Sequence, residues 1–564
     1  MNEIEEILGI TFPKGIKISH ATNSSKKVKK DSIFFGLQGT REHGSKYIED
    51  ALDSGASIAV HNDPDFLSKK NNVFFIKDLE EIDFYDFLLL LYYKETDWGK
   101  DARKYLIYIS GITGTNGKST TAALCQQIWL DKWLYGDNKP RIPKQSMYIG
   151  TLGVKYNHSD FITDFSKNTT PDIFELFEII THFVTRPEGL RVFIEVSSHA
   201  LDQNRLKNTP FCNAAILNIE DDHMDYHKNV ESYVDSKFKI ARQLRSDKVP
   251  FHINSTTYLN IDSPRVFKKI RDLNKANSLL NIEENYGFSL VKKLEHSILS
   301  TVQIPPGHPV AKKDHALLAY DSKADDSSPL RGRDYRYSIL NLDINETEFE
   351  IASFRSSVII RTNIFQEFNI SNLIFAFLLT REELLVGLDH QDWAWDEVIY
   401  QSEYDADYRQ LKLPKGRSEL IKDIPANVII DYAHNPGAFN TFLLSTKEYF
   451  DNLVIIFGCG GNRDQSKRSE MLKIAIENGK NVIFTSDNSR NESFQSILSD
   501  AQQGNSIKNV KVIEDRKEAI IYGSKLIEEK DCLVILGKGH EETQEMDGKI
   551  IHFSDHEVVN EIYK

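Results

Sequence analysis

A glycine-rich run at 114–120, Gly-Thr-Asn-Gly-Lys-Ser-Thr, lies between a predicted strand and a predicted helix. Glycines allow backbone N–H groups to wrap around phosphate oxygens, and the positive end of the following helix attracts the same anion. The run departs from the strict phosphate-loop pattern, because Ile112 stands where that pattern has its first glycine. The alternative is a chance glycine-rich turn, but the strand–loop–helix order favours a nucleotide-binding α/β domain.

Other short apolar runs also end in polar or glycine-rich clusters. In the central part they occupy 105–110, 191–196 and 213–218, the last two ending at SSHALDQNR and IEDDHMDYH. After Gly416 they occupy 427–430, 452–457, 481–485 and 532–536, ending at DYAHNP, GCGGNRD, SDNSRNE and GKGHEETQ. Apolar strands that alternate with helical spacers are typical of βαβ units, whose parallel sheets bind ligands beyond the carboxyl ends of the strands. We therefore predict two α/β domains that face each other across a cleft.

The length of 564 residues predicts about two to four domains, because a single hydrophobic core is rarely that large. Residues 1–100 mix short β-rich runs at 32–37, 57–61 and 73–76 with a helical stretch at 45–54, which indicates a small α/β domain. We place the domains at 1–100, 101–411 and 412–564. Three polar stretches, at about 133–147, 304–333 and 385–408, look like insertions.

The composition argues against several classes of protein. A net charge of −14 disfavours a nucleic-acid or anionic-membrane partner. The longest apolar run, 87–93, is too short to cross a bilayer, and residues 1–20 lack a signal-peptide pattern. Four widely separated cysteines form no Cys-x-x-Cys pair and suit a reducing compartment. We expect a cytoplasmic protein, a monomer, that acts on small molecules and neither inserts into membranes nor binds nucleic acid.

Side chains that follow three central strands could bind a nucleotide and its metal ion. Lys118 would neutralise phosphate charge, and Ser119 could be a ligand of Mg²⁺. Glu195 and His223 each follow a predicted strand and could complete the magnesium coordination. Each cluster alone has a plainer explanation, in which its serines cap helices and its second histidine lies on the surface. These residues are Ser197, Ser198 and His227.

The strand-end clusters of the last block carry further candidates. The segment 431–436 could border the nucleotide, while Lys467 and Arg468 could bind carboxylates or phosphate oxygens. Arg490 and Glu492 offer opposite charges close together in the chain, which suits a zwitterionic amino acid. The alternative for this pair is an exposed salt bridge.

These motifs, with FNISN at 368–372 and GRSE at 416–419, resemble those of the Mur ligases. Mur ligases are ATP-dependent enzymes that build the peptide of bacterial peptidoglycan on a UDP-linked sugar. The motifs follow the family's order along nearly the whole chain, and GKGHE and the 487–492 motif are most similar to the branch that adds the third residue. The resemblance implies three domains: a UDP-sugar-binding N-terminal domain, a central phosphate-loop-type ATPase domain and a C-terminal Rossmann-like domain that brings the amino acid.

The resemblance also implies a role for each matching residue. ATP would be bound by Gly114, Thr115, Asn116, Gly117, Lys118, Ser119, Thr120, Asn369, Asn372, Arg417 and Asp431. Mg²⁺ would be bound by Ser119, Glu195 and His223, and the catalytic residues would be Lys118, Glu195, His223 and Lys237. The UDP-sugar dipeptide would contact Ser24, Asn168, Thr169, Thr170, Ser197 and Arg205. The amino acid would contact Arg463, Asn488, Arg490, Gly537 and Glu541.

The implied reaction couples a diamino acid to UDP-N-acetylmuramoyl-L-alanyl-D-glutamate through an acyl phosphate. The expected diamino acid is meso-diaminopimelate, since lysine-adding relatives usually lack the arginine that matches Arg490. Lys237 matches a lysine that the family carbamylates. The chain departs from the family at Asn23-Ser24-Ser25, where Asp-Ser-Arg is usual, at Gly44-Ser45, where glycine-histidine is usual, and at Ser489, where proline is usual.

Two other functions stay open on the sequence alone. One is a paralogous amide ligase that uses another carboxylate acceptor, such as a folylpolyglutamate-synthase-like enzyme, although the N-terminal domain and the GKGHE ending argue against that branch. The other is a non-catalytic scaffold that binds UDP-sugars. The intact set Lys118, Glu195, His223 and Lys237 argues against the scaffold, because binding alone does not need it.

Overall fold

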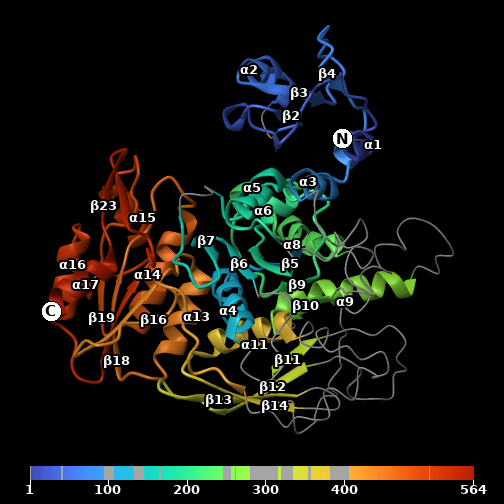
Figure 1. Cartoon of the computed structure of the whole chain (residues 1–564). Coiled ribbons are helices and arrows are strands. Elements are labelled where there is room, and N and C mark those ends of the chain that lie inside the picture. The colour runs from blue at the N-terminus through green and yellow to red at the C-terminus, as the bar shows by residue number, and fades with distance from the viewer. Residues whose placement is uncertain are drawn as a thin grey trace.

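The computed structural model describes residues 2–39, 42–93, 107–131, 145–163, 168–187, 189–244, 256–260, 262–279, 315–318, 335–352, 357–381, 406–506 and 508–564. The predicted insertions lie outside these residues, apart from 145–147, 315–318 and 406–408. The described chain contains sheets of four, eleven and six strands, flanked by helices, and a two-stranded hairpin (Figure 1). The predicted α/β fold is therefore confirmed. Of the helices in these ranges, none is long and apolar enough to cross a membrane.

The N-terminal sheet forms the smallest unit, drawn in blue in Figure 1. Its four parallel strands lie in chain order: β1 (His20–Thr22), β2 (Ser32–Gly36), β3 (Ala56–His61) and β4 (Val73–Phe75). The helices around it are α1 (Asn2–Leu8), α2 (Ile48–Asp53) and α3 (Phe84–Tyr92). The β2 and β3 strands are almost wholly buried, because apolar residues from both faces of the sheet pack against these helices.

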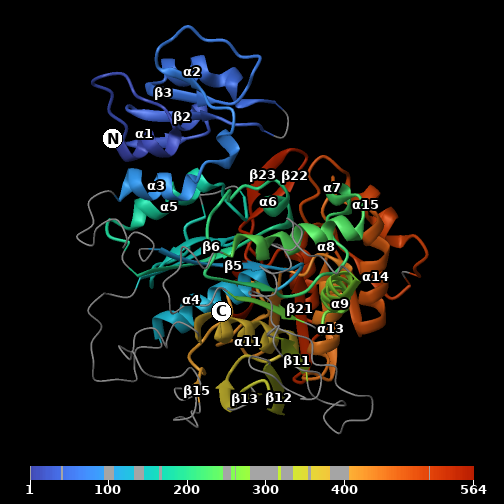
Figure 2. The ribbon, with the colours of Figure 1, turned by 90° about the vertical axis from the view of Figure 1, so that its right-hand side faces the viewer.

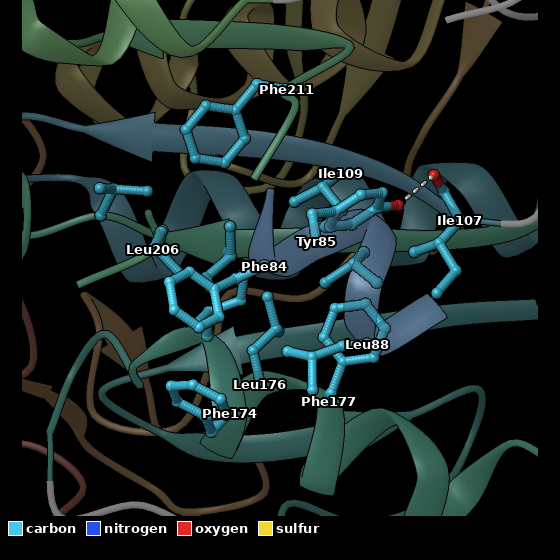
Figure 3. Close-up of a cluster of buried hydrophobic side chains, with 14 of the residues drawn as sticks. Phe84, Tyr85, Leu88, Ile107, Ile109, Phe174, Leu176, Phe177, Leu206 and Phe211 are labelled. Carbon is cyan, nitrogen blue, oxygen red and sulfur yellow. Dashed lines mark hydrogen bonds between the residues drawn. The ribbon is translucent and has the colours of Figure 1, made fainter. Parts of the chain in front are cut away.

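Helix α3 joins the N-terminal unit to the central one. It lies on helix α5 (Ile173–Phe183), as both ribbon views show, and the two helices share a core (Figures 2 and 3). The rings of Phe84 and Phe174 are 5.4 Å apart between centroids, and those of Tyr85 and Phe177 are 5.6 Å apart. The Tyr85 hydroxyl donates to the Ile107 carbonyl at 3.4 Å, where the central sheet begins. The longest apolar run of the sequence, 87–93, belongs to the same core.

The central sheet has the order β15-β14-β13-β12-β11-β10-β9-β5-β8-β6-β7. Its parallel part consists of β5 (Ile107–Thr113), β6 (Gln145–Gly150), β8 (Leu190–Glu195), β9 (Asn213–Ile216) and β10 (Thr256–Asn260). The other strands are β7 (Gly153–Tyr156), β11 (His315–Leu318), β12 (Tyr335–Asn341), β13 (Thr347–Ala352), β14 (Ser357–Thr362) and β15 (Ala406–Asp407). The parallel strands β5, β8 and β9 all end at the same edge, so their following loops meet there.

Helices cover both faces of the parallel strands. Side chains of α4 (Lys118–Asp131) and α11 (Glu367–Arg381) form one core with the sheet. Side chains of α5, α6 (Ser198–Asp202) and α8 (Val230–Phe238) form another core on the opposite face. The remaining helices here are α7 (Met224–His227) and α9 (Pro264–Leu279). This is the layered arrangement expected of βαβ units.

The predicted strand before the glycine-rich run differs from β5 in its bounds. We predicted 105–110 with a loop from Gly111, whereas β5 continues to Thr113, and residues 105–106 lie outside the described ranges. The reason is pairing on both sides: Gly111 pairs with Ile194 of β8 and with Ala214 of β9. Two flanking strands therefore hold Gly111 extended, although glycine alone favours a turn.

The C-terminal sheet has the order β16-β17-β21-β18-β19-β20. Its strands are β16 (Glu419–Leu420), β17 (Asn427–Asp431), β18 (Asn452–Phe457), β19 (Asn481–Phe484), β20 (Val510–Val512) and β21 (Asp531–Leu536). One face packs on α13 (Pro436–Thr446), α14 (Ser466–Asn478) and α15 (Phe494–Gln502), the other on α16 (Arg516–Ser524) and α17 (Asp555–Tyr563). The hairpin of β22 (Thr543–Met546) and β23 (Lys549–His552) follows β21.

Candidate active site

A cavity of about 1050 Å³ is lined by both the central and the C-terminal units. Most of the predicted site residues lie on its wall. They are Thr115, Asn116, Gly117, Lys118, Ser119, Thr120, Thr169, Glu195, Ser197, His223, Lys237, Asn369, Asn372, Arg417, Asp431, Arg463, Asn488, Arg490, Gly537 and Glu541. Loops from the strand ends of two separate sheets therefore converge on one space, as predicted for facing α/β domains. The predicted residues that are not part of this lining are Ser24, Gly114, Asn168, Thr170 and Arg205.

Two lysines meet at the glycine-rich run. Lys118, the first residue of α4, donates to the carbonyl oxygens of Gly114 at 3.0 Å and Thr115 at 2.8 Å. Lys237 on α8 donates to the same Gly114 oxygen at 2.8 Å, and its Nζ lies 4.5 Å from the centroid of the Tyr233 ring. Burial lowers the pKa of Lys118; it lowers the pKa of Lys237 well below its usual value, with help from the Lys118 charge.

Glu195 ends β8, lies on the cavity wall and is fully buried. Its Oε1 accepts from the Thr151 N–H at 2.9 Å and from the Tyr148 hydroxyl, and its Oε2 accepts from the Thr151 hydroxyl at 3.2 Å. A Cβ atom at Gly150 would lie 2.2 Å from the same Oε1, so only glycine leaves room for the carboxylate there. Nothing in the sequence pattern pointed to Thr151 or Tyr148, because their role depends on the strand pairing.

His223 lies in the loop after β9, with a backbone φ of 56°. Its Nε2 is 3.7 Å from Oδ2 of Asp222, and its ring centroid is 5.0 Å from that of His199. Burial lowers the pKa of His223 to about 4, so the ring is neutral at pH 7 and has a nitrogen lone pair to offer. A neutral imidazole beside the glycine-rich run can accept a hydrogen bond or bind a metal ion.

Residues around the start of the C-terminal sheet contact the glycine-rich run of the central unit. The Arg417 guanidinium donates to the Ser119 hydroxyl oxygen at 3.3 Å and lies 4.3 Å above the Tyr432 ring. Asp431, at the end of β17, accepts from the N–H groups of Ser418 and Ala433, both at 2.7 Å. Burial raises the pKa of Asp431. The arrangement brings an arginine from the C-terminal unit to the phosphate loop of the central one.

Two of the residues expected to bind ATP, Asn369 and Asn372, form a chain of amides behind the loop. Asn369 donates to Gln366 Oε1 at 3.2 Å, and Asn372 donates to Asn369 Oδ1 at 3.4 Å. The Asn372 Oδ1 accepts from the Thr121 hydroxyl at 3.4 Å. A Cβ atom at Gly117 would come within 2.3 Å of that same oxygen, so a close approach requires the second glycine of the run. Helix α11 is thereby fastened to the start of α4.

Asn488, Arg490 and Glu541 lie together at the carboxyl end of the C-terminal sheet. Asn488 Nδ2 donates to Glu541 Oε2 at 2.8 Å. Arg490 donates to the Gly461 carbonyl at 2.7 Å, and its Nε lies 3.5 Å from Glu545 Oε2 in β22. A carboxylate and a guanidinium thus border one part of the cavity, which matches a zwitterionic ligand.

The predictions for Glu492 and Arg468 are wrong. Arg468 on α14 is fully buried and donates to Glu492 at 2.6 and 2.7 Å and to Asp500 at 2.7 Å. This hydrogen bonding lowers the pKa of Glu492 to about 2. The two charges satisfy each other where α14 packs against α15, and neither lines the cavity, although Lys467 does. The exposed salt bridge between Arg490 and Glu492, the plainer alternative, is not formed either.

The predicted UDP-sugar contacts divide into two groups. Thr169 and Ser197 line the cavity. Thr170 and Arg205 instead join loops to each other: the Thr170 hydroxyl donates to the Glu195 carbonyl at 2.8 Å, and Arg205 donates to the Thr170 carbonyl at 3.3 Å. Asn168 belongs to the same loop as Thr170, whereas Ser24 lies after β1, where its N–H donates to Thr22 Oγ1 at 3.1 Å.

The plainer explanation of the histidine cluster is partly right. Ser197 caps α6, since its Oγ accepts from the Ala200 N–H at 3.2 Å. Ser198 lies inside that helix, with its Oγ 2.9 Å from Nε2 of His227. His227 is buried, so its assignment to the surface is wrong.

Comparison with known proteins identifies the family of the chain. Residues 112–299 match the Mur ligase middle domain, and residues 416–539 match the Mur ligase, glutamate ligase domain. A UDP-N-acetylmuramoyl-L-alanyl-D-glutamate–2,6-diaminopimelate ligase of Wigglesworthia glossinidia brevipalpis is 32% identical over 551 residues, covering 97% of this chain and 95% of that protein. A protein of the same name from Aquifex aeolicus is 30% identical over 556 residues, covering 97% and 94%.

Two solved structures share the fold over nearly the full length. A structure of a UDP-N-acetylmuramoyl-L-alanyl-D-glutamate–2,6-diaminopimelate ligase has a TM-score of 0.58 and 23% identity, covering 99% of this chain and 98% of that one. A MurF ligase from Thermotoga maritima, solved in complex with ADP, has a TM-score of 0.52 and 13% identity, covering 98% of each chain. With two matching domains and a relative that is 32% identical over 97% of this chain, the chain belongs to the Mur ligase family.

Proposed function

We propose that the protein is the ATP-dependent ligase that joins 2,6-diaminopimelate to UDP-N-acetylmuramoyl-L-alanyl-D-glutamate in peptidoglycan synthesis. One observation carries the proposal: a single cavity joins a phosphate-binding loop with Lys118 and Arg417 to a pocket with Glu541 and Arg490. The first pair suits ATP, and the second suits a diamino acid. The relatives named above carry this activity in their names.

In the first step, the side-chain carboxylate of the D-glutamate attacks the γ-phosphate of ATP, giving an acyl phosphate and ADP. The chain's part in such a transfer is positioning and charge neutralisation. Lys118 lies at the positive end of α4, and Arg417 reaches it from the other unit through Ser119. Both cations can offset the charge that develops on the transferred phosphoryl group.

The residues predicted to hold Mg²⁺ fit such an ion. Ser119 and Glu195 offer the oxygen atoms that Mg²⁺ prefers, and His223 is neutral; the contacts of Thr151 and Tyr148 orient the Glu195 carboxylate. Within the described ranges, no group of three His, Cys, Asp or Glu side chains can hold a metal by itself. When bound, Mg²⁺ would fill its other coordination positions with phosphate oxygens and water, and would offset phosphate charge.

In the second step, the amine of the amino acid attacks the acyl carbon, and the tetrahedral intermediate expels phosphate to leave an amide. Glu541 is placed to attract an ammonium group, and Arg490 to bind a carboxylate. Lysine has no distal carboxylate, so its binding would leave the guanidinium without that partner. We therefore expect lysine to be disfavoured by about 2 kcal/mol or more.

The decisive experiment offers UDP-N-acetylmuramoyl-L-alanyl-D-glutamate, ATP and a panel of amino acids, and identifies products by mass spectrometry. We expect a product with meso-diaminopimelate, formed with a kcat/KM at least about thirtyfold above that for lysine. Arg490→Ala should reduce this preference, and Arg409→Ala serves as a control because that arginine pairs with Asp407 on the surface. Lysine used as well as diaminopimelate would refute the assignment of Arg490.

We also infer a cytoplasmic enzyme. The four cysteines are buried and form no disulfide bond, which is consistent with a reducing compartment.

A further inference from the structure

Lys538 is a fully buried lysine at the carboxyl end of β21, next to the pocket of Glu541 and Asn488. Glycines with positive φ stand on both sides of it, Gly537 at +108° and Gly539 at +54°. This backbone turns the lysine side chain into the protein instead of into the cavity, whose lining does not include Lys538. No role was expected for this residue from the sequence.

The Lys538 Nζ contacts three acceptors. It donates to the Thr543 carbonyl at 2.6 Å, to Glu541 Oε2 at 3.0 Å and to Asn488 Oδ1 at 3.3 Å. None of these three oxygens can donate a proton when Glu541 is ionised. A lysine ammonium has three N–H groups, one for each of these contacts. Lys538 is therefore a buried cation whose donors are all used by the wall of the pocket.

This cation also determines which way the Asn488 amide points. Its Oδ1 accepts from Lys538 and from the Glu545 N–H at 3.0 Å, while its Nδ2 donates to Glu541 at 2.8 Å. If the Asn488 amide were flipped, its NH₂ group would face two other donors, the Lys538 Nζ and the Glu545 N–H. The Oε2 of Glu541 is likewise taken up by Asn488 and Lys538. Among the described residues, its other oxygen, Oε1, accepts from the Tyr432 hydroxyl alone, at 3.5 Å, which leaves this oxygen for a ligand.

The same contacts reach Arg490 through the hairpin. Lys538 holds β22 at Thr543, and β22 in turn holds Arg490, whose backbone N–H donates to the Glu545 carbonyl at 3.0 Å. The Glu545 carboxylate lies 3.5 Å from the Arg490 guanidinium. Lys538 thus links the carboxylate of the pocket to its guanidinium, although it touches neither the cavity nor Arg490.

We infer that Lys538 is a positioning residue that determines specificity: it fixes the spacing between Glu541 and Arg490, and hence the length of diamino acid that the pocket accepts. The inference rests on the proposed function, in which these two groups bind the amino acid. Without the cation, Glu541 and Asn488 lose their shared partner, and β22 is released from the turn after β21. The pocket keeps the charges of Glu541 and Arg490, but the distance between them is no longer fixed.

The test compares Lys538→Met with the wild type in steady-state kinetics for all three substrates. We expect the KM for meso-diaminopimelate to rise on the order of tenfold to a hundredfold, because charged hydrogen bonds to the pocket are lost. The KM values for ATP and the UDP-dipeptide should stay unchanged, since Lys538 contacts neither predicted site. The preference for diaminopimelate over lysine should fall as well, an effect that general loss of stability does not produce.

Lys415→Met is the matched control. Lys415 lies close to the same turn and donates to Glu542 at 2.6 Å, but its side chain is 46% exposed. An exposed lysine–glutamate pair contributes little, so this variant should keep the wild-type KM for diaminopimelate. If Lys538→Met does not fold, as judged by its melting temperature, Lys538→Gln retains an amide donor and serves for the same kinetic comparison.

A double variant separates positioning from unrelated damage. If Lys538 acts through Glu541, adding Lys538→Met to Glu541→Gln should raise the KM for diaminopimelate little further. Additive effects, or equal changes in all three KM values, would overturn the inference. A wild-type enzyme that makes no product with diaminopimelate would instead overturn the proposed function, so the two failures are distinguishable.

Discussion

Lys118 and Lys237 donate to one carbonyl oxygen, that of Gly114. Two buried amines at one acceptor repel each other if both are charged, and burial favours the neutral form of each. The pKa of Lys237 is the more strongly lowered, which makes its amine the better nucleophile at neutral pH. We therefore propose different chemistry for the two lysines of this cavity: Lys118 as the cation for phosphate, and Lys237 as the amine that reacts.

We expect Lys118→Ala to abolish ligation while leaving the UDP-sugar bound. The substitution removes a cation from the phosphate loop and leaves the charge of the γ-phosphate uncompensated. Losing one such contact lowers kcat by roughly a hundredfold or more. The measurement is phosphate release together with UDP-dipeptide binding by calorimetry. A variant with near wild-type turnover would show that this loop does not serve ATP.

We expect Lys237 to be carbamylated in the active enzyme. A neutral amine can add CO₂, and the product is an anion whose oxygens suit a neighbouring Mg²⁺ better than an amine does. Labelling with ¹³C-bicarbonate should give a carbamate signal that Lys237→Ala lacks. That variant should lose most activity and regain part of it with added short-chain carboxylates. The assignment would be contradicted if the wild type gave no labelled carbamate signal and the alanine variant were fully active.

At the scale of elements, Gly416 and Gly539 allow the linker, the chain between β15 and β16, to approach the turn after β21 closely. A Cβ atom at Gly416 would lie 2.2 Å from both the Gly539 carbonyl carbon and the His540 nitrogen. Gly416 also has a φ of +64°, which a larger residue rarely adopts. The close approach places Arg417 beside the phosphate loop and the turn of Gly537–Glu541 beside the amino-acid pocket. One backbone contact therefore positions residues of both proposed binding sites.

We expect Gly416→Ala to raise the KM for ATP and to lower the melting temperature, because the linker must move away from β21. Gly504→Ala is the matched control: its φ is +76°, but nothing lies within 4 Å of the added Cβ. Both variants carry strain of about 1 kcal/mol from the positive φ. Any larger fall in melting temperature for Gly416→Ala than for Gly504→Ala therefore measures the clash. Equal melting temperatures and equal KM values for the two variants would refute this account.

The strands were largely predictable from sequence, and the pairings of side chains were not. Short apolar runs with polar ends identified β17, β18, β19 and β21 to within a residue or two, because buried parallel strands need continuous apolar sequence. The end of β5 was misplaced, since pairing on both sides outweighs the local preference of Gly111. Family motifs found most of the cavity lining. Lys538 escaped notice because Asn488 lies 50 residues away in the chain, and the contacts with Glu541 and Thr543 depend on how the turn after β21 folds.

Ion pairs, too, could not be predicted from the sequence. Glu492 was assigned to a ligand, yet Arg468 binds it from a neighbouring helix. A carboxylate and a guanidinium separated by 24 residues meet only when α14 and α15 pack together, so composition alone cannot show which charges remain for a ligand. The division into domains at 100 and 411 remains a prediction. The chain passes from the central sheet at β15 to the C-terminal sheet at β16, between residues 407 and 419.

At the scale of the whole molecule, the N-terminal unit is attached by a core and by charges. Helices α3 and α5 share aromatic contacts (Figure 3), and beside them Lys27 and Lys29 pair with Glu178 at 3.2 and 3.3 Å. Asn23 donates to Asp172 Oδ2 at 3.1 Å. Asn23 stands where Asp is usual in Mur ligases, and an aspartate there would face the Asp172 carboxylate. Asn23 thus donates a hydrogen bond across the interface that an ionised aspartate could not donate.

We expect Asn23→Asp to weaken this attachment and to raise the KM for the UDP-dipeptide several-fold, equivalent to about 1 kcal/mol. Two carboxylates would meet where one amide now donates, and Asp172 cannot turn away without releasing the N–H of Glu175, which it caps at 3.0 Å. The effect should shrink at high salt, which screens partly exposed charges. Asn23→Ala, the control, loses only the hydrogen bond and should change the KM less.

Adding Asp172→Asn to Asn23→Asp restores an amide–carboxylate pair in the reverse sense and still caps α5, so the KM should recover. A double variant as impaired as Asn23→Asp alone would mean that Asn23 acts on the substrate directly and not through Asp172.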